Sequence, residues 1–174
     1  MKNGYWQKIL RINLTARKTR VESIAEKDLE EFIGGAGLGA EILRREIPEK
    51  INPYDPRNLV IFATGPFQGT PVPGGAKFSI VGISPLTATF ADSAAGADWG
   101  HSLKRAGYDV VILEGVSEKP VYIQIVDDDI QFKDACNLWG KDTIESTDAI
   151  HEETGDRKLS IATIGPAGGQ KVAI

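Results

Sequence analysis

The stretch EEFIGGAGLGAEILRRE, residues 30–46, decides which class of fold the chain can adopt. Gly35, Gly37 and Ala40 fit the spacing G-x-G-x-x-G/A, which cradles a dinucleotide pyrophosphate when a strand precedes the glycines and a helix follows them. The preceding residues instead carry helical periodicity, so the glycines join one helix to another. The acidic residue expected about 20 positions later would be Asp55, in a proline-rich loop. Both requirements fail, and we expect a tight corner that lets two helices, or a helix and a sheet, pack closely.

The segments on either side of this corner are expected to be a hairpin and two helices. Residues 5–24 predict a β-hairpin, because large apolar side chains alternate with polar ones along part of their length. The first helix follows, with Ser23 and Glu26 at the spacing of a capping box. The second helix runs over residues 38–47, until Pro48 stops it.

After residue 50 the chain changes to short apolar stretches separated by turn residues. The strand candidates are NLVIFATGP, AKFSIVGI, TATFAD, YDVVILEG, VYIQIVDD and IQFKDA. Two helices interrupt them. One is DWGHSLKRA, closed by Gly107, and the other is TIESTDAIHEE, with Asp142 as N-cap, Glu145 completing a capping box and Gly155 as terminator. Because most strands follow one another directly, the pattern predicts an α+β fold with largely antiparallel sheets.

Two segments of the chain echo each other. NLVIFATGPFQG at residues 58–69 and KLSIATIGPAGG at residues 158–169 both give an apolar strand, a Gly-Pro turn and a further glycine. A pseudo-duplicated fold would produce this echo, and so would two independent strand-turn units. The last residues, KVAI, resemble a strand cut off in mid-course.

Composition and charge exclude several classes of protein. The 174 residues predict one domain, and 20 basic against 24 acidic residues give a net charge of −4, which excludes a nucleic-acid or anionic-membrane partner. The single cysteine rules out a disulfide framework or an all-cysteine metal site within the chain. No apolar run approaches the ~18 residues of a membrane span, and the N-terminus lacks a signal-peptide core. We therefore expect a cytoplasmic protein.

Few residues taken singly point to chemistry. His101 and His151, the only histidines, lack partners at ligand spacing, which favours surface or packing roles. Cys136 has no basic neighbour in the sequence, so a buried inert thiol is expected. The three aspartates at 127–129 predict a solvated hairpin turn, because the glycine and distal glutamate of a calcium loop are missing.

The most informative region covers residues 65–115, where small residues and turns surround Lys77 and the run Asp92-Ser93-Ala94-Ala95-Gly96-Ala97. Small residues in series let a flat ligand or another backbone approach the main chain closely. Free amides ahead of a helix can hold a phosphate group. The region therefore suits an anionic, planar ligand. The alternative is tight sheet-on-sheet packing, which this reasoning alone slightly favours.

Several specific segments stand in one order along nearly the whole chain. They are GAGLGAEIL, NLVIFATGPFQGTPVPGG, SPLT, LKRAGYDVVILEG, EKPVYIQI, LWGKDT and IGPAGG. This combination resembles the N-terminal domain of the tungsten-containing aldehyde:ferredoxin oxidoreductase family. The resemblance implies an α+β domain of two sheets that forms a platform under a bis-pterin metal cofactor.

The same resemblance implies what the full-length protein would contain and do. Tungsten, or molybdenum, would be held by two molybdopterins whose phosphates share a magnesium ion. An aldehyde would be oxidised to a carboxylic acid, with electrons passing through a [4Fe–4S] cluster to ferredoxin, and a homodimer is a further expectation. Residues 1–174 would be the N-terminal cofactor-platform domain, truncated at its C-terminal end, and the cluster-binding and catalytic domains would be absent.

This chain alone is then expected to be inactive and to hold no bound cofactor. Two other functions stay open. One is a non-catalytic scaffold or binding module that uses the same domain, and the other is a related reductase with a different substrate.

The resemblance also assigns candidate cofactor-binding residues by position. A family arginine that contacts the pterin lies seven positions before the serine of SPLT, and counting back from Ser84 gives Lys77. Ungapped counting places a family Asn-Ser-Gly-Gly segment, which contributes main-chain contacts, at Ala94, Ala95, Gly96 and Ala97, while a local shift would use Asp92 and Ser93. Lys77 as an ordinary exposed lysine, and Gly96 as a packing residue, remain alternatives. The family segment IGPAGEN reads IGPAGGQ here, which suggests a divergent branch.

Overall fold

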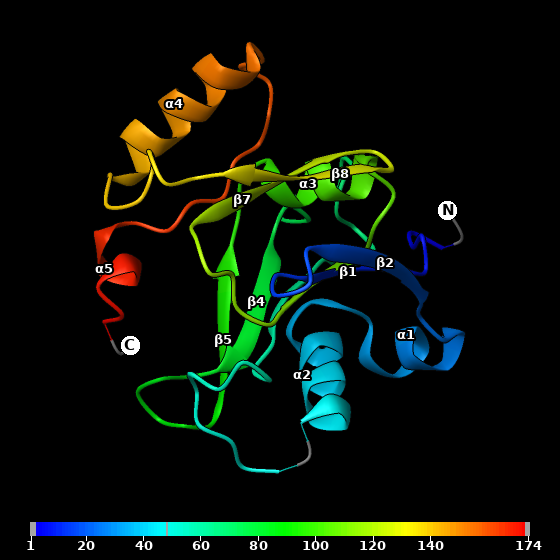
Figure 1. Ribbon diagram of the computed structural model, residues 1–174. Helices are drawn as coiled ribbons and strands as arrows, with labels where there is room; N and C mark the ends of the chain where they lie inside the picture. Colours follow the sequence, from blue (N-terminus) through cyan, green and yellow to red (C-terminus); the bar gives the residue numbers. More distant parts are fainter. Residues whose placement is uncertain (1–2, 48, 173–174) are drawn as a thin grey trace.

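Six strands form the main sheet of the computed structural model, which describes residues 3–47 and 49–172 (Figure 1). Their order across the sheet is β2-β1-β6-β3-β4-β5, and a separate hairpin pairs β7 with β8. The strands are β1 Lys8–Asn13, β2 Lys18–Ser23, β3 Val60–Ala63, β4 Phe78–Ile83, β5 Phe90–Ala95, β6 Val110–Glu114, β7 Val121–Val126 and β8 Asp129–Asp134. The expected hairpin near the N-terminus and all six later strand candidates are confirmed.

The pairing within both sheets is antiparallel with one exception, which confirms the expected α+β fold with two largely antiparallel sheets. The exception is the parallel pair of β1 and β6, in which Ile9 lies opposite Val110. β6 therefore joins the N-terminal hairpin on one side to β3 on the other, where Ile61 lies opposite Ile112. The strands β3, β4 and β5 continue the sheet to its far edge.

The helices are α1 Glu26–Phe32, α2 Gly35–Glu46, α3 Trp99–Arg105, α4 Thr143–Thr154 and α5 Pro166–Gly169. One face of the main sheet packs under α1 and α2, and the other packs under α3 and the β7–β8 hairpin (Figure 1). The first core consists of Ile9, Ile24, Leu29, Leu38, Ile42, Leu43, Leu59, Ile61, Ala63, Val81, Val110 and Ile112. The second is built on Leu10, Ile12, Leu103, Tyr108 and Val111. The alternation of strand residues between these cores is what period-two patterning requires.

The glycines of residues 34–39 form the corner that the sequence predicts. A Cβ at Gly34, whose φ is +156°, would lie 2.5 Å from the Thr64 carbonyl oxygen, so the chain reverses against β3 there. A Cβ at Gly39 would lie 2.9 Å from Val81 Cγ2, so this glycine lets α2 pack closely on the sheet. α2 begins at Gly35, three residues earlier than expected, and ends at Glu46; Pro48 lies outside the described residues.

The helix caps agree with the sequence at α4 and differ at α1. Asp142 accepts hydrogen bonds from the backbone N–H groups of Ile144 and Glu145, both at 2.8 Å, in a complete capping box. The prediction of a capping box at Ser23 is wrong, because Ser23 is the last residue of β2 and pairs with Lys8. The N-cap of α1 is Ala25, which has no side-chain acceptor.

The sequence echo is not accompanied by a repeated structure in the described residues. Its first copy contains β3, but residues 158–165 form no strand, and α5 begins at Pro166 instead. The echo therefore reflects similar turn chemistry and not a duplicated unit. At the C-terminus, Lys171 and Val172 form no strand, and residues 173–174 lie outside the described part.

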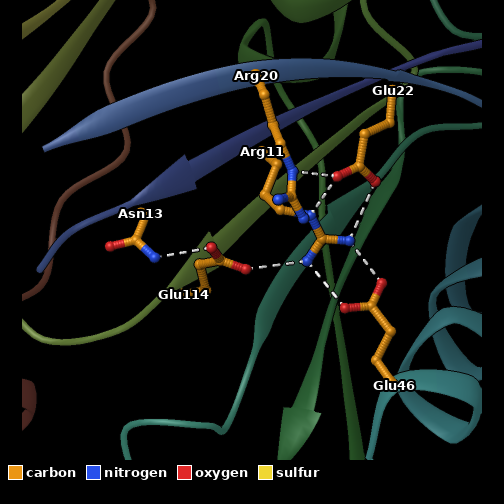
Figure 2. Close-up of polar contacts among 6 residues, drawn as sticks. All are labelled: Arg11, Asn13, Arg20, Glu22, Glu46 and Glu114. Carbon is orange, nitrogen blue, oxygen red and sulfur yellow. Dashed lines mark hydrogen bonds and ion pairs between the residues drawn. The ribbon is translucent and has the colours of Figure 1, made fainter. Parts of the chain in front are cut away.

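A buried arginine joins α2 to the N-terminal strands (Figure 2). Arg11 on β1 is 3% exposed and contacts three carboxylates from three elements. Its guanidinium donates to Glu22 on β2 at 2.7 Å, to Glu46 at the end of α2 at 2.5 Å, and to Glu114 on β6 at 3.2 Å. Burial by itself lowers the pKa of Arg11, but the hydrogen bonds to Glu46 and Glu22 outweigh it and raise that pKa.

A second charged cluster fixes α1 against α2. Glu41 accepts hydrogen bonds from Arg44 at 2.8 Å and from Arg45 at 2.5 Å, and Arg45 also donates to Asp28 on α1 at 2.7 Å. The hydrogen bond from Arg44 lowers the pKa of Glu41 to about 2 against the effect of burial, and Arg45 acts in the same direction. The lowered pKa means that the Glu41 carboxylate contributes stability above its ordinary pKa of 4.5, and that this contribution is lost as pH falls toward about 2.

Candidate cofactor-binding edge

The structure brings together the two segments that the sequence singles out. β4 and β5 pair antiparallel, with Phe78 opposite Ala95 and Ser79 opposite Ala94. Lys77 directly precedes β4, and the register continued by one residue sets it opposite Gly96. We call Lys77 and residues 94–97 together the β5 rim.

The β5 rim is open. Lys77, Ala94, Gly96 and Ala97 are exposed, and Ala95 is half-buried. A Cβ built at Gly96 meets no atom of the described chain within 4 Å. The alternative of tight internal packing, slightly favoured by the residues alone, is therefore wrong for this segment.

The backbone of the rim offers hydrogen-bonding groups as well as space. β5 is the last strand of the main sheet, and β4 is its sheet partner. In an antiparallel edge strand, alternate peptide groups point away from the sheet and are free to bind another molecule. An exposed ammonium, outward N–H groups and small side chains together suit a flat ligand that carries negative charge.

Three aromatic rings support the rim from below. The Trp99 ring, in the first turn of α3, lies 5.0 Å from the Phe62 ring and 4.9 Å from the Phe78 ring, measured between centroids. This contact joins α3 to β3 and β4 beneath the end of the sheet where Lys77 lies. This ring contact could not be predicted from the sequence, because aromatic residues so far apart in the chain give no shared pattern.

A buried ion pair anchors the other end of α3. Lys104 and Asp109 form an ion pair with side-chain exposures of 4% and 1%, and the Lys104 ammonium also donates to the Gly4 carbonyl oxygen at 2.8 Å. The second Asp109 oxygen accepts from the Gln7 N–H at 2.6 Å. This pair ties the N-terminal segment to the segment LKRAGYD, and its only sequence signal is a lysine and an aspartate in an otherwise apolar corner.

The other candidate residues have structural roles. His151 contacts the Leu159 carbonyl oxygen through Nε2 at 3.1 Å. Cys136 is exposed, so the expectation of a buried thiol is wrong; its hydrogen bond to Asp134 raises its pKa. Asp127 and Asp128 form the turn between β7 and β8, as expected, and Asp129 is the first residue of β8. Across residues 3–47 and 49–172, no group of three or more His, Cys, Asp or Glu side chains has the arrangement of a metal site.

This mixed α+β domain is of the class found at the N-terminus of aldehyde ferredoxin oxidoreductases. Residues 9–174 match the family described as "Aldehyde ferredoxin oxidoreductase, N-terminal domain". The chain therefore belongs to this family, as its N-terminal domain.

Known relatives and a solved structure agree with this assignment. The chain is 42% identical over 169 residues to the tungsten-containing aldehyde ferredoxin oxidoreductase of Pyrococcus abyssi, covering 97% of this chain and 28% of that protein. It is 37% identical over 157 residues to the "Aliphatic sulfonate oxidoreductase, WOR-like subunit" of Pyrococcus furiosus, covering 86% of this chain and 25% of the relative. The chain thus spans about a quarter of the length of these relatives.

The solved structure is the active site complex BamBC of benzoyl coenzyme A reductase with 1,5-dienoyl-CoA. It superposes with a TM-score of 0.93 at 35% sequence identity, over 97% of this chain and 26% of that one. The expected fold class is therefore confirmed at the level of the whole domain.

The family implies a tungsten-pterin cofactor, and the β5 rim fits one. A pterin is flat and its phosphate is anionic, while the rim offers room at Gly96, outward amides on β5 and the charge of Lys77. Within the described part of the chain, the helices all fall short of the length and apolarity that a membrane crossing requires.

Proposed function

We propose that this chain is the cofactor-platform domain of a tungsten-dependent enzyme that oxidises an aldehyde to a carboxylic acid and passes the electrons to ferredoxin. One observation carries the proposal: Lys77, directly before β4, lies opposite the end of the edge strand β5, where residues 94–97 form an open rim. Family membership and the names of the relatives support it. The cytoplasmic location expected from the sequence stays a prediction.

The groups of this chain bind and orient the cofactor. The Lys77 ammonium pairs with a phosphate as a point charge, without the two-pronged geometry of an arginine. Outward N–H groups of β5 donate to oxygen atoms of the pterin or its phosphate, and Ala94, Ala95 and Gly96 admit a flat ring close to the backbone. When bound, the tungsten-pterin group supplies the two-electron redox chemistry.

The other components of the enzyme come from outside these residues. A [4Fe–4S] cluster is held by four cysteine thiolates, and this chain has one cysteine, so we place the cluster ligands in another part of the polypeptide. We further propose a magnesium ion between the phosphates of two molybdopterins, with molybdenum as an alternative to tungsten. Ferredoxin as electron acceptor and assembly as a homodimer belong to the same proposal.

A second candidate function changes the substrate. The relatives include an aliphatic sulfonate oxidoreductase, and the superposed structure is a benzoyl coenzyme A reductase complex. This domain therefore occurs with substrates that are not simple aldehydes, and a reductase acting on another substrate would use the same β5 rim.

Tungsten content tests the proposed site. In the complete polypeptide, purified from cells supplied with tungstate, Lys77→Ala is expected to lower the tungsten bound per chain. Lys77→Arg keeps the charge and adds a bidentate donor, so it should retain tungsten. Lys141→Ala, which removes an exposed lysine ahead of α4, is the matched control and should leave the content unchanged.

Two results would overturn the proposal or replace it. Equal tungsten content in wild type and Lys77→Ala would remove Lys77 from the site. A complete polypeptide without tungsten or molybdenum would indicate a non-catalytic scaffold instead. Turnover of a panel of aldehydes, compared with reduction of acyl-thioester substrates, separates the aldehyde oxidoreductase from the second candidate.

A further inference from the structure

Gln68 is a buried polar residue in the loop between β3 and β4, and it is 2% exposed. The Gln68 amide faces two carbonyl oxygens on one side and a backbone N–H on the other, and this assigns its orientation. With the nitrogen on the carbonyl side, it donates to the carbonyl oxygens of Gly75 at 3.0 Å and Lys77 at 2.9 Å. Its amide oxygen accepts from the backbone N–H of His101 at 3.1 Å. Both amide hydrogens and the oxygen are thus engaged, and every partner is a backbone group.

One of these bonds caps a helix from a distance. The residue before α3, Asp98, makes no side-chain hydrogen bond to the first turn. His101 is the third residue of α3, and its N–H is one of the groups that a helix leaves without an internal acceptor. Gln68 supplies that acceptor, which a local N-cap residue supplies in most helices.

The helix makes room for this contact at one position. A Cβ at Gly100 would lie 2.8 Å from Gln68 Cδ and 3.2 Å from Phe78 Cδ1. The backbone of Gly100 has no positive φ, so the requirement for glycine there comes from the approach of Gln68 and not from strain. Gln68 and Gly100 therefore form a matched pair.

The amide nitrogen of Gln68 holds the loop before β4, which makes few other hydrogen bonds to the rest of the domain. Residues 71–74 are exposed. The further hydrogen bonds found here in the described structure are local, such as Gly75 N–H to the Val72 carbonyl oxygen at 3.1 Å and Thr70 Oγ1 to the Phe67 carbonyl oxygen at 2.7 Å. Through Gln68, which also accepts from His101, these two bonds give the loop a buried hydrogen-bonded connection to α3.

We infer that Gln68 is a positioning residue for the cofactor: it holds the backbone of Lys77 in place relative to α3, the helix that follows residues 94–97. This inference rests on the proposed function of the β5 rim. Gln68 does not touch the ligand, because its amide is buried and fully used. Its loss would leave the residues of the rim intact and remove the hydrogen bonds that link the Lys77 backbone to α3, so that the Phe78–Trp99 ring contact would be left to hold this side of the rim to the helix.

Two variants test this in the complete polypeptide, with tungsten per chain and hydrogen exchange of the tungsten-free protein as the readouts. Gln68→Met keeps the length of the side chain and removes its hydrogen bonds. We expect amide exchange at residues 75–77 and 99–101 to become roughly tenfold faster, since a lost buried cap raises the local opening equilibrium by about that factor. Tungsten content should fall, while exchange in β7 and β8 should not change.

Gly100→Ala gives an independent test, because alanine favours helix more than glycine does. Better helix propensity alone would slow exchange in α3, whereas displacement of Gln68 predicts faster exchange and less tungsten. Gln131→Met, which removes an exposed glutamine of β8, is the control and should alter neither readout. If Gln68→Met prevents folding, the exchange rates and tungsten content of Gly100→Ala test the inference instead.

The outcomes separate the inference from the proposed function. Unchanged tungsten in the Gln68 and Gly100 variants, with reduced tungsten in Lys77→Ala, overturns the inference and leaves the proposed site standing. Unchanged tungsten in Lys77→Ala overturns the proposed site, and the inference with it. Reduced tungsten without faster exchange at residues 75–77 and 99–101 also overturns the inference, because the loss would not come from positioning.

Discussion

Replacing Arg11 by methionine tests how the sheet holds α2. Methionine has a similar length and is apolar, so it fills the space while removing every hydrogen bond to Glu22, Glu46 and Glu114. Removing one partner of a buried ion pair costs about 3–5 kcal/mol. The three carboxylates keep 29%, 36% and 23% of their side-chain surface and can be partly rehydrated. We therefore expect Arg11→Met to lower the free energy of unfolding by about 3 kcal/mol at pH 7.

The pH dependence of this loss identifies its cause. The hydrogen bond from Arg11 lowers the pKa of Glu22 below its ordinary value of 4.5, against the effect of burial. A lowered carboxyl pKa contributes stability that is present above the ordinary value and is lost as pH falls through the folded-state value. In the variant Glu22 loses this hydrogen bond and faces two other carboxylates without a cation between them, which raises its pKa. The difference between wild type and variant should therefore be largest at neutral pH and shrink below about pH 4.5.

Urea unfolding followed by circular dichroism at pH 7 and pH 4 measures both quantities. Arg20→Met is the matched control, because Arg20 donates to the same Glu22 at 2.6 Å from a side chain that is 65% exposed. An exposed pair of this kind is worth less than about 1 kcal/mol. An equal cost for Arg11→Met at the two pH values, or a cost no larger than that of Arg20→Met, would refute the reasoning.

Three further predictions concern other contacts. Gly39→Ala should destabilise the fold by about 1–2 kcal/mol despite better helix propensity, because the methyl would clash with Val81, and Val81→Ala should recover part of this loss in a double-mutant cycle. Lys104→Met leaves the Asp109 carboxylate buried without its cation and should cost about 3 kcal/mol or more, and adding Asp109→Asn should reduce that cost in the same unfolding assay. Glu41→Gln should flatten the pH dependence of stability between the ordinary pKa of 4.5 and about 2, measured by unfolding across that range, because the depressed carboxyl pKa contributes stability that is lost as pH falls through this window.

Features set by neighbouring residues could be predicted from the sequence. The cap and end of α4 follow from Asp142, Glu145 and Gly155, whose roles depend on a few bonds within one helix. The same reasoning failed at Ser23, because the sheet pairing with Lys8 competes with the helix cap and wins. Local propensity indicates which secondary structures a segment can adopt, and pairing with distant residues determines which of them forms.

Some residues of the candidate site could likewise be predicted from the sequence, and others could not. Lys77 and Gly96 were found by their spacing from a family motif, and the antiparallel register of β4 and β5 brings them side by side. Gln68 and Gly100 were missed, because a buried amide bonded to three backbone groups leaves no trace in residue spacing. The sequence signal for this contact was Gly100, a glycine inside a predicted helix and away from any turn that would explain it.

The parallel pairing of β1 with β6 has a consequence for the order in which the chain folds during synthesis. β1 cannot pair with β6 until the segment around Val110, about one hundred residues after Ile9, has been synthesised. Until then the β1–β2 hairpin leaves the ribosome with one long side of β1 unpaired, in reach of other nascent chains. Chaperone contacts with this domain should therefore concentrate on the early hairpin and end when the segment around Val110 emerges.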